Sequence, residues 1–109
     1  MPGTFEHRAR LALHKGDDNA ALNFVNKSLI RNQRNQTTRH LKCSILRRLG
    51  RLRDAISFAK ESVDLDPFSM GCHFEIFLTL AAQNEHEQSE EALLNIKRIM
   101  RGNVHHYCE

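Results

Sequence analysis

The feature that most constrains this chain of 109 residues is an internal similarity at a spacing of 34 residues. The stretch 11–30, LALHKGDDNAALNFVNKSLI, aligns without a gap with the stretch 45–64, ILRRLGRLRDAISFAKESVD. The aligned pairs are Gly16 with Gly50, Ala21 with Ala55, Leu22 with Ile56, Ser28 with Ser62, and Leu29 with Val63. A repeated unit of this length buries its apolar face only against neighbouring units. The period therefore predicts one domain, 1–109, built as a stack of similar units.

Apolar residues at helical spacing, punctuated by glycine and proline, predict six helices. The expected ranges are 4–15, 19–31, 37–49, 53–65, 70–83 and 89–101. Gly50 is expected to end a helix in the left-handed conformation, which glycine adopts without a Cβ clash. Asp66 is expected to end another, because the residue before Pro67 is disfavoured in helical geometry. Ala55, Ala59 and Ser62 are small and about one turn apart, so a neighbouring helix can approach closely there.

The third unit is less regular than the first two. Ala92 lies 37 residues after Ala55, so the linker 84–88 is expected to be about three residues longer than in the other units. Ser89 is the expected N-cap of the sixth helix, followed by acidic residues in its first turn. After Gly102, residues 103–109 are predicted to begin a seventh helix that belongs to a truncated next repeat.

The second unit resembles the tetratricopeptide repeat. Its matching positions are Gly50, Leu52, Ala55, Ile56, Ala59, Ser62, Leu65 and Pro67. The resemblance implies an all-α, right-handed solenoid of antiparallel helix pairs, with repeats at about 2–35, 36–69 and 70–102. Arg39 and Lys42 depart from the family pattern, which has a large aromatic residue and a leucine at those positions, and this puts the interior of the second repeat in doubt.

In this family the first helices of successive repeats line a concave groove. Carried over to this sequence, the groove positions imply a partner-binding set of Arg10, His14, His40, Ser44, Arg47, Arg48, Phe74 and Leu78. Basic residues at its middle and apolar residues toward its C-terminal end favour an acidic or mixed protein or peptide segment as partner. The family's clamp on a C-terminal carboxylate is disfavoured, because Leu41, Gly71 and Glu75 stand at three of its positions.

Composition and motifs predict a non-catalytic protein. The net charge is +3 and the longest apolar run, 76–82, is far shorter than the ~20 residues of a membrane span. The N-terminus lacks the apolar segment of a secretory signal, so a cytoplasmic location is favoured. No phosphate-binding glycine loop or nucleophile–base arrangement stands out.

Histidines and cysteines raise the question of a metal site. His105, His106 and Cys108 are close together, but a second ligand pair with zinc-like spacing is absent, so neither a metal nor another cofactor is expected. Cys43 and Cys72 are predicted to be buried free thiols that act as small apolar residues.

Three further hypotheses remain open. Residues 41–109, with RRLGRLRDAI and the closing RGNVHHYCE, resemble large bacterial proteins that join a galactose-mutarotase-like domain to a tetratricopeptide array, which implies an accessory module of a larger carbohydrate-active parent chain. An arginine stripe suggests nucleic-acid binding, which is disfavoured because few aromatic residues are available to stack bases. The stripe comprises Arg31, Arg34, Arg39, Arg47, Arg48, Arg51 and Arg53. The last helix crowds apolar residues that cannot all face one hairpin, which predicts a homodimer through them. These residues are Leu93, Leu94, Ile96, Ile99 and Met100.

Overall fold

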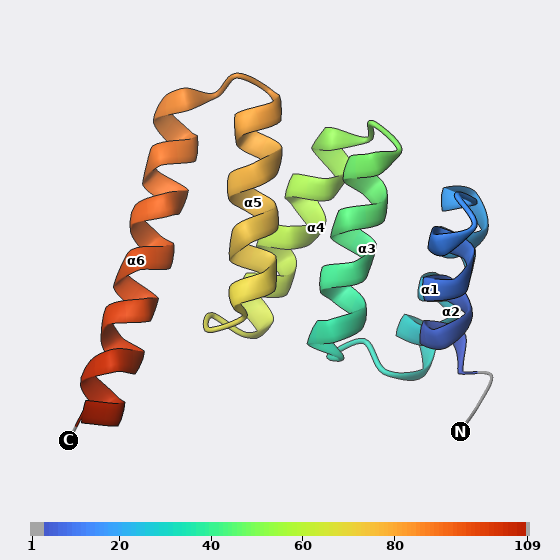
Figure 1. Cartoon of the computed structure of the whole chain (residues 1–109), viewed down its shortest axis with the longest axis horizontal. Helices are drawn as coiled ribbons and strands as arrows, with labels where there is room; N and C mark the ends of the chain where they lie inside the picture. The colour runs from blue at the N-terminus through green and yellow to red at the C-terminus, as the bar shows by residue number, and fades with distance from the viewer. Residues whose placement is uncertain (1–3, 109) are drawn as a thin grey trace.

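The computed structural model describes the backbone of residues 4–108 and the side chains of residues 4–101, and this part of the chain is all-helical. The helices are α1 (Phe5–His14), α2 (Asp18–Arg31), α3 (Gln36–Arg48), α4 (Leu52–Leu65), α5 (Met70–Ala82) and α6 (His86–Cys108). Each helix contacts the next along the chain, and α3 also contacts α5. Figure 1 shows them side by side, with α1 and α2 at one end of the molecule and α6 at the other. The first five helices lie within one residue of their predicted bounds.

The turns inside the helix pairs repeat the same hydrogen bonds every 34 residues. The amide groups of Asp17, Arg51 and Glu85 donate to carbonyl groups five residues earlier, those of Ala12, Leu46 and Leu80. The residue before each donor has a positive φ: 83° at Gly16, 79° at Gly50 and 60° at Asn84. This is the left-handed ending that satisfies the last carbonyl groups of a helix. The predicted role of Gly50 is confirmed.

The links between the pairs repeat as well. Asn35 and Ser69 are the N-caps of α3 and α5, and each donates its amide hydrogen to the carbonyl group three residues earlier, on Asn32 and Asp66. The carboxylate of Asp66 also accepts a hydrogen bond from the Phe68 amide, as the side chain of Asn32 does from Arg34. Helix α4 ends at Leu65, before Asp66 and Pro67, as predicted.

The prediction of a longer third linker is wrong. Helix α6 begins at His86, and only three residues, Gln83, Asn84 and Glu85, separate it from α5. Asn84 lies 34 residues after Gly50 and takes its place, because asparagine tolerates the left-handed region better than most residues. Ser89 is therefore not an N-cap. It is buried, 6% exposed, inside α6, at the position of Ala21 and Ala55.

The predicted break at Gly102 is also wrong, because α6 continues as one helix to Cys108. A single glycine costs a helix about 1 kcal/mol relative to alanine, which weakens a helix without necessarily ending it. The predicted seventh helix from 103 onward is thus the last part of α6. The side chains of His105, His106 and Cys108 lie outside the described residues.

Small residues form much of the core. Ala9 and Ala12 of α1 pack with Ala21 and Val25 of α2 and with Ile45 of α3. In α4 the three small residues Ala55, Ala59 and Ser62 are at most 1% exposed, as the sequence predicts. Cys43 and Cys72 are fully buried. Their predicted positions in the core are confirmed.

Candidate functional site

Three of the predicted partner-binding residues meet around one buried carboxylate. His40, Ser44 and Arg47 recur at intervals of four and three residues, so they share one face of α3. All three contact Glu75 of α5, which is 3% exposed. Ser44 Oγ donates to Glu75 Oε1 at 2.7 Å, His40 Nε2 lies 3.3 Å from the same oxygen, and Arg47 Nε donates to Oε2 at 3.0 Å. These contacts join α3 to α5.

The surroundings of Glu75 keep it ionised. Burial by itself would raise the pKa of this carboxyl, but hydrogen bonds from His40, Arg47 and Ser44, together with the charge of Arg47, lower its pKa to about 2. The hydrogen bond to Glu75 in turn raises the pKa of His40 above 6.5, although partial burial of the ring acts in the opposite direction. Such charge-assisted hydrogen bonds are stronger than neutral ones. The cluster therefore fixes Arg47 and His40 in place.

Gly71 makes room for the imidazole ring of His40. A Cβ atom at position 71 would lie 2.6 Å from His40 Nδ1 and 2.8 Å from its Cγ, too close for either atom to stay. The side chain of His40 is 45% exposed, so the ring can turn toward solvent. Gly71 thus permits the contact between His40 and Glu75.

Gly71→Ala is expected to lower the pKa of His40 toward 6.5, because the displaced ring loses its hydrogen bond to Glu75. The free energy of unfolding is expected to change by less than about 1 kcal/mol, since alanine's better helix propensity offsets the loss of a half-exposed contact. NMR titration of the imidazole protons measures the pKa, and His40→Gln identifies the signal. An unchanged His40 pKa in Gly71→Ala would contradict this role of Gly71.

Phe74 and Leu78 of α5 lie beside Glu75 in sequence, and their side chains are open to solvent. They are 42% and 41% exposed and one helical turn apart, so they share a face of α5. We call the surface formed by His40, Ser44, Arg47, Phe74 and Leu78 the α3–α5 face. It contains five of the eight predicted site residues.

The other three predicted residues do not join this cluster. Arg48 Nη2 lies 3.3 Å from Asp18 Oδ1 on α2. Arg10 pairs with Glu6 of its own helix at 3.1 Å, and His14, in the last turn of α1, is exposed. The structure thus places Arg48 toward α2, not beside Arg47 on the α3–α5 face.

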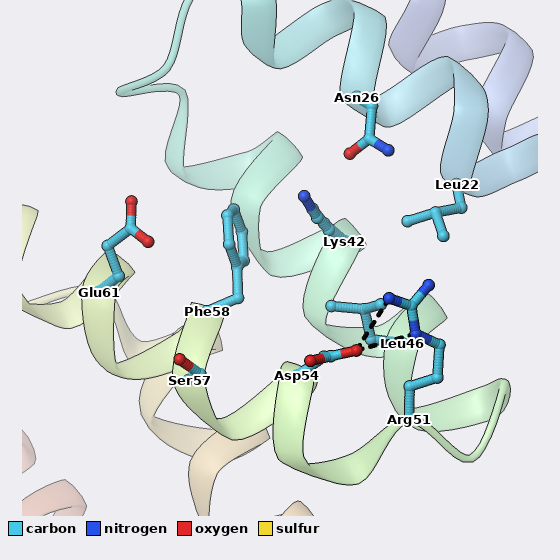
Figure 2. Close-up of a pocket in the computed structure, with 9 residues that line it drawn as sticks. All are labelled: Leu22, Asn26, Lys42, Leu46, Arg51, Asp54, Ser57, Phe58 and Glu61. Atoms are coloured by element: carbon cyan, nitrogen blue, oxygen red, sulfur yellow. Dashed lines mark hydrogen bonds and ion pairs between the residues drawn. The ribbon is translucent and has the colours of Figure 1, made fainter.

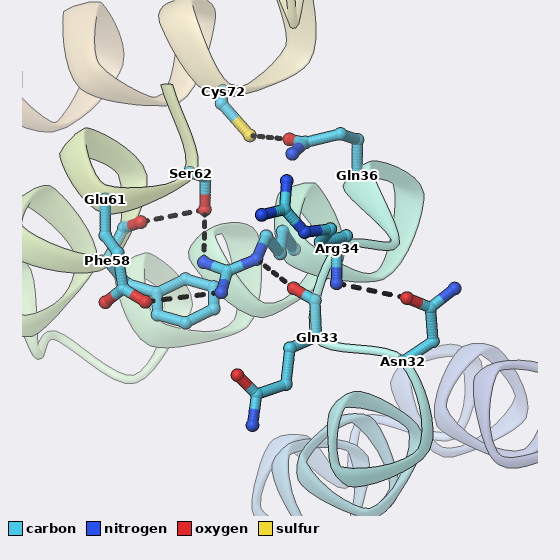
Figure 3. A network of polar contacts seen from close by, with 9 residues as sticks. Asn32, Gln33, Arg34, Gln36, Phe58, Glu61, Ser62 and Cys72 are labelled. Carbon is cyan, nitrogen blue, oxygen red and sulfur yellow. Dashed lines mark hydrogen bonds and ion pairs between the residues drawn. The ribbon is translucent and has the colours of Figure 1, made fainter. Parts of the chain in front are cut away.

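Arg39, which the sequence left as a doubtful interior residue, is a buried link between helices. It is 4% exposed, and its guanidinium group donates to the Gln33 carbonyl oxygen, to Ser62 Oγ at 3.1 Å and to Glu61 Oε1 at 3.2 Å. It also lies against the Phe58 ring, 4.7 Å from the centroid. Figure 3 shows Ser62, Glu61 and Phe58 of α4 gathered around these contacts. A cation with polar partners thus occupies the site where the tetratricopeptide pattern has an aromatic ring.

Sequence reasoning missed Glu75 as the centre of the cluster. Glu75 is the one acidic residue in α5, MGCHFEIFLTLAA, an otherwise mostly apolar helix. A lone carboxylate in such a helix calls for a buried partner, because an unpaired buried charge is costly. That signal pointed to Glu75 but could not identify which basic residues pair with it.

The apolar residues of α6 divide between core and surface. Ile96 is 2% exposed, whereas Leu94 and Met100 are each 52% exposed. The expectation that these residues cannot all be covered is confirmed for the described side chains. A homodimer through them stays a prediction.

Comparison with known proteins adds no family assignment: no protein-family model matches the chain, and no curated protein does. Among the helices that the structure describes, none has the length and apolar character needed to cross a membrane.

Proposed function

We propose that this chain is a non-catalytic scaffold of the tetratricopeptide type, a right-handed solenoid of antiparallel helix pairs that binds a protein or peptide segment on the α3–α5 face. The recurrence of the same turn hydrogen bonds at 34-residue intervals supports the repeat assignment. In such arrays successive units form an extended surface suited to a chain segment.

The observation that carries the proposal is a positioned guanidinium group next to exposed apolar side chains. Arg47 is 33% exposed and uses Nε to bind Glu75. Among the described residues, its two Nη nitrogens donate to no side chain, so they remain available for a carboxylate. Phe74 and Leu78 offer apolar contacts on the adjoining helix. This combination suits a segment in which acidic and apolar residues alternate.

Glu75 limits what the face can accept. Its negative charge offsets one positive charge of the cluster and would repel a carboxylate brought directly against α5 at this point. A segment that places an acidic side chain over Arg47 and apolar side chains over α5 avoids that repulsion. Binding is therefore expected to depend on both features.

An acetylated and amidated peptide of alternating glutamate and leucine is expected to bind more tightly than its counterpart with lysine in place of glutamate. Leu78→Ala is expected to weaken binding of the acidic peptide about tenfold, as a lost apolar contact of this size predicts. Fluorescence anisotropy of the labelled peptides measures both effects. Ile30→Ala on α2 is the matched control, since Ile30 is a 79% exposed aliphatic residue away from this face.

Two results would overturn the proposal. The first is equal binding of the acidic and basic peptides, which would remove the role of Arg47. The second is an identical loss of affinity in Leu78→Ala and Ile30→Ala, which would mean that the peptide adheres to exposed apolar groups in general.

The accessory role in a carbohydrate-active parent chain and the nucleic-acid alternative stay predictions. The arginine stripe is smaller than the sequence suggested, because Arg39 is buried and Arg47, Arg48 and Arg51 are engaged by carboxylates. These contacts leave fewer positive charges for phosphate groups.

A further inference from the structure

A pocket of about 270 Å³ lies between α2, α3 and α4, away from the α3–α5 face. Lys42 and Leu46 of α3 line it, each two residues beyond His40 and Ser44 respectively. A separation of two residues turns a side chain by about 200° around a helix axis, so the pocket and the Glu75 cluster lie on opposite faces of α3. Figure 2 shows Asn26 and Leu22 of α2 facing Lys42 and Leu46 across the pocket.

The walls of this pocket are apolar and its rim is polar. Leu46 is 3% exposed, and Leu22 and Phe58 are half-buried. The Lys42 ammonium lies 4.5 Å from the centroid of the Phe58 ring. Asn26 adds an amide group that can donate a hydrogen bond. The volume is at the small end for ligand pockets and suits a group the size of one side chain.

Lys42 is the charge in this pocket that has no counter-ion. Arg51 binds Asp54 through Nε at 2.9 Å and Nη2 at 2.8 Å, and Glu61 binds Arg39 at 3.2 Å. Among the described side chains, no carboxylate forms an ion pair with Lys42. The other cation and both carboxylates that line the pocket are therefore already paired.

The neighbours of Lys42 make its positive charge unfavourable. Burial lowers the pKa of Lys42 below its ordinary value, and the charge of Arg39 lowers it further. Both cations lie against the ring of Phe58, with Lys42 at 4.5 Å and Arg39 at 4.7 Å from its centroid. An anion bound next to Lys42 would relieve this repulsion.

We propose that this pocket binds a single carboxylate carried on a small aliphatic group, with the carboxylate on Lys42 and Asn26 and the aliphatic group against Leu22, Leu46 and Phe58. The net positive charge at its centre selects the anion, and the apolar walls select what carries it. A free aliphatic acid and the C-terminal leucine of a peptide share this chemistry.

The test uses isocaproate as the probe, with amide NMR spectra of the whole chain recorded during a titration. Isocaproate is expected to bind in the millimolar range and to shift the signals of Asn26, Lys42 and Phe58. Isocaproamide, which has the same shape without the charge, is expected to bind at least about tenfold more weakly. Equal binding of the acid and the amide, or shifts confined to other parts of the chain, would overturn the proposal.

Variants separate this pocket from the peptide-binding face. Lys42→Met keeps the side-chain stem over Phe58 and removes the charge, so it is expected to abolish the preference for the acid. Lys60→Met, at an exposed lysine of α4, is the matched control, and Leu78→Ala is expected to leave isocaproate binding unchanged. Persistence of the preference in Lys42→Met would overturn the proposal, and circular dichroism confirms that the variant is folded. The comparison of acid with amide in the unmodified chain does not depend on any variant.

A final arm distinguishes the two sources of the carboxylate. Tighter binding of acetylglycylleucine than of isocaproate would assign the pocket to a peptide C-terminus, and the reverse order would assign it to a free aliphatic acid. Absence of binding by both compounds would overturn the proposal.

Discussion

Glu75→Gln is expected to lower the free energy of unfolding by about 2 kcal/mol near pH 6, because hydrogen bonds to a charged group contribute about 1.5–3 kcal/mol each and glutamine retains only part of them. The glutamine oxygen can still accept from Ser44 or His40, but its amide group faces Arg47 Nε, which is also a donor. Arg47 and His40 are partly exposed and are rehydrated, so the cost stays below that of stranding a fully buried charge.

The effect of Glu75→Gln is expected to depend on pH in a defined direction. The pKa of Glu75 is about 2 in the folded chain and 4.5 in its absence of interactions, so its contribution is present above about pH 5 and is lost as the pH falls toward about 2. The pKa of His40 is raised, so its contribution is present below 6.5 and is lost as the pH rises through the folded value. The difference between the two chains should therefore be largest between about pH 5 and about pH 6.

Urea unfolding followed by circular dichroism over this pH range measures the difference. Glu90→Gln is the matched control, because Glu90 is an exposed glutamate of α6, and it is expected to change the unfolding free energy by at most about 0.5 kcal/mol. A difference that stays constant down to about pH 2 would show that the carboxylate charge is not what stabilises the cluster.

The helix bounds were predictable because local signals set them. Gly16 and Gly50 end helices through a backbone conformation that few other residues adopt, and Pro67 restricts the residue before it. The third unit was misaligned because Asn84 performs the same role as those glycines. Ala92, the nearest alanine, then took the place that belongs to the buried Ser89. The error came from following residue identity where the backbone conformation was what recurred.

The candidate site was predictable in part. The tetratricopeptide resemblance placed His40, Ser44 and Arg47 together, since their positions on one face of α3 follow from helical spacing. Their common partner could not be found in this way. Glu75 lies on another unit, at the position of Leu41 in the second unit, so no repeated pattern announces it. Contacts between units depend on how the helices pack, and they break the repetition that made the rest readable.

Arg39 shows how a departure from a repeat pattern is compensated. Arg39→Ala is expected to lower the free energy of unfolding by about 3 kcal/mol, because it removes the hydrogen bond to the Gln33 carbonyl group and the packing of the stem and guanidinium on Phe58, and leaves a cavity. Arg39→Met keeps most of the stem and is expected to cost about half as much.

The ion pair of Arg39 contributes the least of its contacts. Glu61 is 61% exposed and is rehydrated when its partner is lost, so Glu61→Gln is expected to cost less than about 1 kcal/mol. Ser62 keeps its own hydrogen bond to the Phe58 carbonyl oxygen, at 2.8 Å, when Arg39 is replaced. Urea unfolding of the three variants gives the order, with Arg53→Ala at an exposed arginine of α4 as the control. If Glu61→Gln destabilised the chain as much as Arg39→Ala, the ion pair and not the packing against Phe58 would be what replaces the missing aromatic residue.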